Sequence, residues 1–169
     1  KIKNEQRKFE WLSIRHLLIQ LGFEKEDIVY DKHGKPSLLN SNSFLSISHS
    51  KNRIAVGINK LNEIGIDLQK ISPGIKTISH KFLSSSDIVK FEELNELELT
   101  KAWSTKEAIF KVNGKKDIFL KENIEIKAIE NKSSNTIITA LLKDNFRTKT
   151  YNVNVIVIKD YILAYTLND

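Results

Sequence analysis

The order of predicted helices and strands constrains the fold of this 169-residue chain more than any other feature of its sequence. Apolar residues at mostly three- or four-residue spacing predict a helix over residues 9–21, which Gly22 ends. Those apolar residues are Phe9, Leu12, Leu17, Leu18 and Leu21. A turn at Gly34-Lys35-Pro36 follows, and then come strands predicted over residues 44–48, 54–58 and 64–68.

The second part of the chain repeats this order with a longer helix. The run Ser84 to Asp87 predicts a helix start leading into residues 88–93, and a long helix is expected over residues 96–112, ended by Asn113-Gly114. Four strands are predicted after it, over residues 124–129, 136–142, 151–158 and 161–166.

This succession predicts an α+β protein made of two similar halves, each a helix with an antiparallel sheet. Ser72-Pro73-Gly74 is the best candidate junction, so the halves are expected at residues 1–71 and 72–169, packed as one compact unit. A 40% hydrophobic content in 169 residues suffices for one domain or for two small halves that share a core.

Composition excludes several classes of protein. The absence of cysteine excludes a disulfide scaffold, a thiolate zinc site and a cysteine nucleophile. No apolar run approaches 18 residues, so no membrane span is expected, and the charged first residues do not resemble a secretion signal. A cytoplasmic protein is the simplest interpretation. Because the chain also lacks methionine, its first residue is not expected to be the encoded start.

The net charge of +6 favours an anionic partner only weakly. Lysines are scattered along the chain and only four of the 27 basic residues are arginine, which compositional bias would also produce. A nucleic-acid-binding protein would more often show a clustered patch with arginine or aromatic residues, so no nucleic-acid partner is predicted.

Three short segments contain residues that could carry chemistry. In the first, residues 46–50 (Ser-Ile-Ser-His-Ser), His49 lies at a strand end between hydroxyls, where it could hydrogen-bond phosphate oxygens. An ordinary polar strand end is the alternative.

In the second segment, residues 64–69, Asp67 and Gln69 are two apart on a strand and therefore share one face. Their oxygens suit Mg²⁺, although Asp67 could instead cap the following turn.

The third segment is residues 103–111, Trp-Ser-Thr-Lys-Glu-Ala-Ile-Phe-Lys. Glu107 and Lys111 lie one helical turn apart on one face, and the alternative to a functional role is a surface ion pair that contributes a few tenths of a kcal/mol. Trp103 is interpreted as a core anchor.

In combination, the order and spacing of these segments resemble the 4′-phosphopantetheinyl transferase superfamily, in its larger, surfactin-synthetase-activating type. The resemblance runs through roughly residues 7–114. The segments that carry it are Arg7, Glu10, Leu12 and Arg15 in the first helix, then Gly34-Lys35-Pro36, Ile47-Ser48-His49-Ser50, Gly65-Ile66-Asp67, and Trp103-Ser104-Thr105-Lys106-Glu107-Ala108 with Lys111.

The resemblance implies a Mg²⁺-dependent enzyme that moves the phosphopantetheine arm of coenzyme A onto a serine of an acyl or peptidyl carrier protein and releases adenosine 3′,5′-bisphosphate. It implies two similar halves in one chain, with the active site at their junction, and a monomer is expected to suffice. Asp67 and Glu107 are the implied metal carboxylates, and Gln69 stands where many relatives have a glutamate. Glu107 is also the implied proton acceptor, and Lys111 is expected to meet the phosphates or to share in proton transfer.

The resemblance also implies the residues that bind coenzyme A. His49 is expected to contact a phosphate, Lys35, Pro36 and Ser48 to border the nucleotide, and Arg15 to meet the 3′-phosphate. Two rival interpretations remain: a catalytically weak relative, and a basic module that only binds an acidic carrier protein or nucleic acid.

Overall fold

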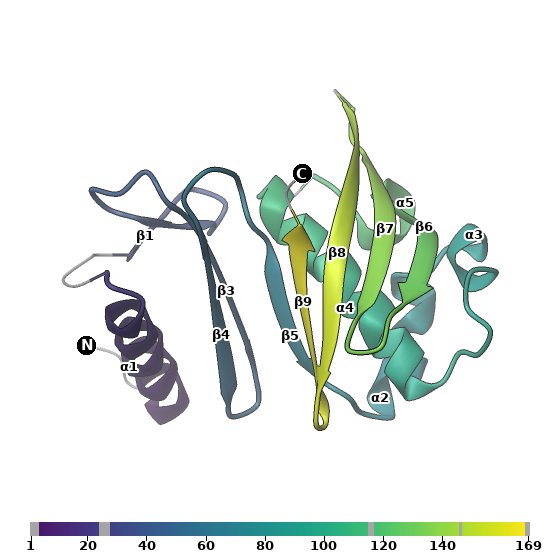
Figure 1. The fold of residues 1–169 in the computed structure, drawn as a ribbon, viewed down its shortest axis with the longest axis horizontal. Coiled ribbons are helices and arrows are strands. Elements are labelled where there is room, and N and C mark those ends of the chain that lie inside the picture. The colour runs from purple at the N-terminus through teal and green to yellow at the C-terminus, as the bar shows by residue number, and fades with distance from the viewer. Residues whose placement is uncertain (1–3, 24–27, 115–116, 146, 168–169) are drawn as a thin grey trace.

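The computed structural model describes residues 4–23, 28–114, 117–145 and 147–167. Figure 1 shows the arrangement of the helices and strands. In chain order these are α1 (Glu5–Gln20), β1 (Ile28–Tyr30), β2 (Pro36–Leu38), β3 (Phe44–Ser50), β4 (Arg53–Asn59), β5 (Ile66–Lys70), α2 (Gly74–Ile78), the 3₁₀ turn η1 (Ser79–Lys81), α3 (Ser85–Ile88), α4 (Glu96–Asn113), α5 (Leu120–Asn123), β6 (Ile124–Asn131), β7 (Thr136–Lys143), β8 (Thr148–Ile158) and β9 (Tyr161–Leu167).

The larger part of the molecule is a five-stranded antiparallel sheet covered on one face by α4 (Figure 1). Its strand order is β5-β9-β8-β7-β6. Strand β5, the first strand of this sheet along the chain, therefore lies at one edge and is paired with β9, the last. Buried residues alternate with less buried ones along β7, β8 and β9, because successive side chains of a strand point to opposite faces. The buried apolar side chains form the core beneath α4. The predicted α+β class is therefore confirmed.

The N-terminal part consists of α1 and two hairpins, β1–β2 and β3–β4. It has a small apolar cluster of its own, formed by Ile14, Leu18, Leu38 and Leu45. Strand β5 lies before the predicted junction at residue 71, yet it forms its backbone hydrogen bonds with β9.

Serine side chains fasten the β3–β4 hairpin to the edge of the five-stranded sheet. The backbone N–H groups of Ile66, Leu68 and Lys70 in β5 donate to the hydroxyls of three serines at alternate positions of β3, at 3.0–3.1 Å. These serines are Ser46, Ser48 and Ser50, and their period of two places all three hydroxyls on one side of the strand. The three bonds satisfy edge donors that would otherwise be left without partners.

Several predicted elements have different bounds in the structure. Helix α1 begins earlier than predicted, because Asn4 caps it and accepts the N–H of Arg7. Of the apolar residues that gave its pattern, Phe9, Leu12 and Leu21 are exposed, and the buried contacts come from Ile14 and Leu18. The apolar spacing therefore indicated the helix correctly but not the face that it buries.

Other bounds differ in the middle of the chain. Helix α3 has only four residues and ends before the predicted extension to residue 93, although Ser84 and Asp87 form the capping box of its start. The third strand is shifted by two residues, to Ile66–Lys70. The short elements β1, β2, α2 and α5 escaped prediction because each has five residues or fewer and carries little periodic signal. Among the described residues, no helix is both long and apolar enough to span a membrane.

Candidate active site

The close approach of β5 to α4 builds the candidate site. A side chain at Gly65 would meet the backbone oxygen of Ala108 at 1.9 Å, so only glycine permits this contact between strand start and helix. The N–H of Gly65 donates to the hydroxyl of Thr166, and its carbonyl accepts the N–H of the same residue, which fixes it against β9. Asp67, two residues on, is thereby held against α4.

Helix α4 carries Glu107 and Lys111, the other two residues predicted to take part in the chemistry, and its position beside β5 brings them to Asp67. Asn95 caps its first turn, and Gly114, in the left-handed conformation at φ 68°, ends it as predicted. Trp103 anchors the helix in the core, because its ring meets Phe82 edge-on with centroids 5.1 Å apart. This confirms the interpretation of Trp103 as a core residue.

Asp67, Lys111 and Ser48 form a compact hydrogen-bonded group. The ammonium of Lys111 donates to Asp67 Oδ1 at 2.9 Å, to Ser48 Oγ at 2.9 Å and to the backbone oxygen of Ile66 at 3.0 Å. Ser48 donates in turn to Asp67 Oδ1 at 3.0 Å. Lys111 thus pairs with an aspartate 44 residues away in the sequence. The alternative of a simple surface ion pair between Glu107 and Lys111 therefore does not describe the surroundings of this lysine.

Glu107 lies in the electrostatic field of this group. Burial is the main cause that raises the pKa of Glu107 to about 7, the negative charge of Asp67 adds to the rise, and Lys111 opposes it. Two carboxylates that repel each other in a partly buried site favour a cation between them.

A divalent cation fits these residues. Asp67 Oδ2 is buried and accepts no hydrogen bond within the described chain, which leaves one carboxylate oxygen available as a ligand. Gln69 is on the same face of β5 by strand alternation, and its amide nitrogen donates at 3.5 Å to the backbone oxygen of Lys70. Among the described residues, no group of three or more His, Cys, Asp or Glu side chains gathers, so the candidate ligands are two carboxylates with the amide oxygen of Gln69 beside them.

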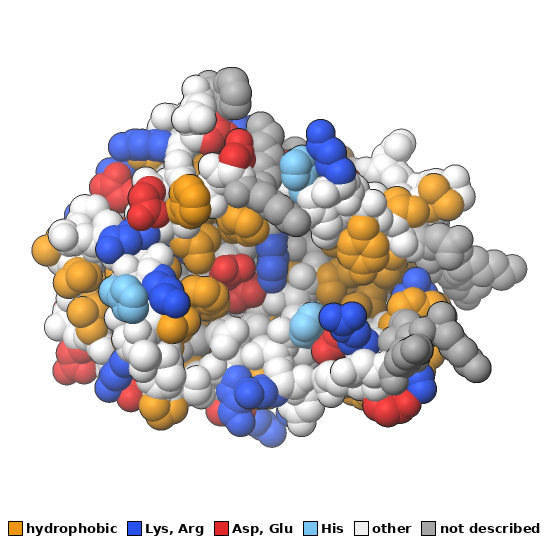
Figure 2. Space-filling view, turned by 180° about the vertical axis from the view of Figure 1, so that it is seen from behind, with side chains coloured by type: hydrophobic (Ala, Val, Ile, Leu, Met, Phe, Trp, Pro, Cys, Tyr) orange, Lys and Arg blue, Asp and Glu red, His pale blue; other side chains and the backbone are white. Residues whose placement is uncertain are grey.

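A cavity of about 200 Å³ adjoins Lys111. Gly34, Lys35 and Pro36 form one side of it, Ser46 and Ile47 another, and Phe110 and Lys111 a third. Lys35 Nζ donates to Glu63 at 3.0 Å and to the backbone oxygen of Val112 at 2.8 Å. Figure 2 views the molecule from the α4 side and shows acidic and basic side chains next to each other in a hollow near the middle of this face.

The structure places the remaining predicted residues outside this group. His49 points to the opposite side of β3 from Ser48, is 55% exposed, and lies 3.5 Å from Glu10 of α1. Arg15 lies on α1, where its guanidinium stacks 3.6 Å above the ring of Trp11 and donates to the backbone oxygen of that residue. The structure therefore brings together Asp67, Glu107, Lys111 and Ser48, with Lys35 and Pro36 in the adjoining cavity.

Sequence reasoning missed the role of Lys106. Its side chain is fully buried, and its ammonium donates to Asp87 Oδ2 at 2.7 Å and to the backbone oxygens of Leu120 and Ile124. Burial lowers the pKa of Lys106, while the hydrogen bond and charge of Asp87 oppose the shift. The one available signal was that Lys106 lies about 100° round the helix from Glu107 and so points away from the face of that residue.

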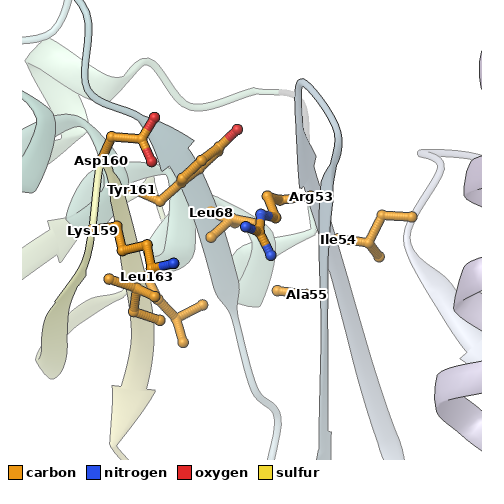
Figure 3. A pocket seen from close by; sticks show the side chains of 9 residues that line it. Arg53, Ile54, Ala55, Leu68, Lys159, Asp160, Tyr161 and Leu163 are labelled. Atoms are coloured by element: carbon orange, nitrogen blue, oxygen red, sulfur yellow. The ribbon is translucent and has the colours of Figure 1, made fainter.

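A second cavity lies on the other face of β5 and is distinct from this group. Leu68, which alternates with Asp67, forms its floor together with Leu163 (Figure 3). Arg53 and Lys159 extend over that floor from opposite sides. None of the predicted site residues lines it.

Comparisons with known proteins give a family model and a relative that this chain resembles. The family model described as the 4′-phosphopantetheinyl transferase superfamily matches residues 63–166, which include Asp67, Glu107 and Lys111. A protein of Synechocystis sp. named "Putative 4′-phosphopantetheinyl transferase" is 30% identical over 95 residues. That alignment covers 51% of this chain and 39% of the relative, so the chain spans less than half the length of the curated relative it matches.

Proposed function

Because the chain belongs to the 4′-phosphopantetheinyl transferase superfamily, we propose that it transfers the 4′-phosphopantetheine arm of coenzyme A to a serine hydroxyl of an acyl or peptidyl carrier protein. The reaction depends on Mg²⁺ and releases adenosine 3′,5′-bisphosphate. The larger, surfactin-synthetase-activating type is part of the proposal, and the motif residues between Gly34 and Lys111 support it.

The buried oxygen of Asp67 is the observation that carries this proposal. Asp67 Oδ2 has no partner in the described chain and lies on the strand face that meets Glu107 and Lys111 of α4. A purely structural aspartate at this depth would have both oxygens hydrogen-bonded, because an unpaired buried carboxylate oxygen costs free energy. The arrangement supports a site that a bound cation would complete.

In the proposed transfer, the serine oxygen attacks the β-phosphorus of coenzyme A, and the bond from that phosphorus to the oxygen of adenosine 3′,5′-bisphosphate breaks. Positioning and charge neutralisation are the main needs of such a step. Asp67 and Glu107 would hold Mg²⁺, which supplies positive charge to the pyrophosphate oxygens when it is bound.

The residues of this chain supply the rest. Glu107 accepts the serine proton, directly or through one water. A cation held there would favour the charged form of this carboxyl. Lys111 adds a positive charge beside the pyrophosphate. The cavity lined by Lys35 and Pro36 receives the nucleotide. His49, exposed at the end of β3, offers a hydrogen bond to a phosphate, and Arg15 a charge to the 3′-phosphate.

Mass spectrometry tests the proposal directly. An apo carrier protein incubated with this chain, coenzyme A and Mg²⁺ should gain the mass of one phosphopantetheine, while a carrier whose acceptor serine is replaced by alanine should not. The variant Glu107→Gln provides the enzyme-side control, because it keeps the shape of the side chain and removes its charge. An unmodified carrier under these conditions, across fatty-acid, polyketide and peptide carriers, would contradict the proposal.

A further inference from the structure

The serines that join β3 to β5 are alike in one contact and unlike in another. Ser46, Ser48 and Ser50 each accept one backbone N–H from β5, at 3.0, 3.0 and 3.1 Å. All three side chains are buried at the same strand junction. Removing any one hydroxyl therefore removes the same kind of backbone hydrogen bond.

Only the middle serine has further partners among the described residues. Ser48 Oγ also accepts the ammonium of Lys111 at 2.9 Å and lies 3.0 Å from Asp67 Oδ1. A hydroxyl has one proton to donate and two acceptor positions. The N–H of Leu68 and the ammonium of Lys111 occupy both acceptor positions, so the hydroxyl proton is directed at Asp67 Oδ1.

The hydrogen bond from Ser48 determines which carboxylate oxygen of Asp67 is left to bind a metal ion. Oδ1 accepts hydrogen bonds from Ser48 and from Lys111, while Oδ2 remains buried without a partner. Without the serine proton, the carboxylate would keep only the flexible lysine as an orienting donor.

We propose that Ser48 is a positioning residue for Asp67: its hydroxyl, held by the backbone of β5, orients the carboxylate so that Oδ2 is presented as the metal ligand. The inference rests on the proposed function for the identity of the bound group. It differs from the role that the sequence suggested, in which Ser48 borders the nucleotide, because the structure uses every hydrogen-bonding position of this hydroxyl within the protein.

The chain supplies its own matched controls. We compare Ser48→Ala with Ser46→Ala and Ser50→Ala, and measure Mn²⁺ affinity by electron paramagnetic resonance in the absence of coenzyme A and carrier. Loss of a hydrogen-bond partner of a ligating side chain typically weakens metal binding by about 10- to 100-fold. We expect that loss for Ser48→Ala alone. All three variants should have lowered melting temperatures, because each loses one backbone hydrogen bond to β5, and Ser48→Ala should lose the most because Ser48 has two further partners.

A second variant covers the case in which Ser48→Ala does not fold. Ser48→Cys nearly preserves the volume of the side chain, and a thiol is a weak donor. It should therefore remain folded and show reduced Mn²⁺ affinity.

Two outcomes would overturn the inference: wild-type Mn²⁺ affinity in folded Ser48→Ala or Ser48→Cys, or equal weakening in Ser46→Ala. If the unchanged Mn²⁺ affinity is accompanied by a raised KM for coenzyme A, the result favours a phosphate contact by Ser48 instead. Because Mn²⁺ binding requires no transfer, a chain whose Mn²⁺ affinity depends on Ser48 as proposed, but which modifies no carrier, would contradict only the proposed function.

Discussion

Helix α4 carries two lysines that each pair with an aspartate from another element, and the two pairs differ in how fully their polar atoms are satisfied. Lys106 and Asp87 are 2.7 Å apart, and both side chains are 0% exposed. Lys111 and Asp67 are 2.9 Å apart, with 26% and 7% of their side chains exposed.

The first pair is closed. Asp87 accepts the N–H and hydroxyl of Ser84, the ammonium of Lys106 and the N–H of Ile126, so both carboxylate oxygens have partners. These bonds join α3, α4 and β6. In the second pair Asp67 Oδ2 has no described partner. A second carboxylate, that of Glu107, has its pKa raised by burial and, to a smaller extent, by the negative charge of Asp67. Complete satisfaction indicates a structural role, and the open oxygen indicates a site that binds something.

The largest expected effect is the loss of the closed pair. Lys106→Met leaves Asp87 buried without a cation, and such changes cost about 3–5 kcal/mol of unfolding free energy. Urea unfolding followed by circular dichroism measures this loss. Lys76→Met is the control, since Lys76 pairs with Glu96 of α4 near solvent, with side chains 52% and 35% exposed, and its loss should cost much less. Equal losses in the two variants would remove the distinction between the pairs.

The next effect concerns the open pair. Asp67→Asn keeps the side-chain shape and removes the charge, so we expect transfer to the carrier to fall by about 100- to 1000-fold. Its melting temperature should change by only a few degrees, because Ser48 and Lys111 can still donate to the amide oxygen. Asp160→Asn removes an exposed partner of Lys70 and should retain normal turnover. Near wild-type turnover in folded Asp67→Asn would contradict the assignment of Asp67.

A smaller effect should appear as a pH dependence of stability without metal. The pKa of Glu107 is about 7 in the folded chain against an ordinary value of 4.5, so the stability that its proton provides is complete below about pH 4.5 and is lost as the pH rises through 7. Glu107→Gln does not titrate. Relative to wild type, it should gain about 2–3 kcal/mol between pH 5 and pH 8.

Denaturant unfolding in the presence of a chelator measures this difference. Added Mg²⁺ should stabilise the wild type more than the variant at pH 8, because a bound cation favours the charged carboxylate. A difference between the two proteins that stays constant with pH would mean that the Glu107 carboxyl is better solvated than its burial indicates.

Much of the fold follows from local patterns. Asn95 and Gly114 bound α4 almost where the sequence predicts, and alternation identifies β3, β4, β7, β8 and β9 to within a few residues. Caps and periodicity act over a few residues, so they can be read directly from the chain. The predicted apolar face of α1 was wrong because burial depends on which element covers a helix, and the described part of the chain leaves Phe9 and Leu12 at least half exposed.

The sequence by itself determined the chemical groups and their local spacing: Asp67 on a strand, and Glu107 and Lys111 one turn apart on a helix. Only the tertiary structure decided their partners. Lys111 meets Asp67, 44 residues away, and Lys106 turns into the core toward Asp87, while Ser48 directs its proton at Asp67. The reason is physical: spacing within one element follows from backbone geometry, whereas contacts between elements depend on packing, here on the absence of a side chain at Gly65, which lets β5 reach α4.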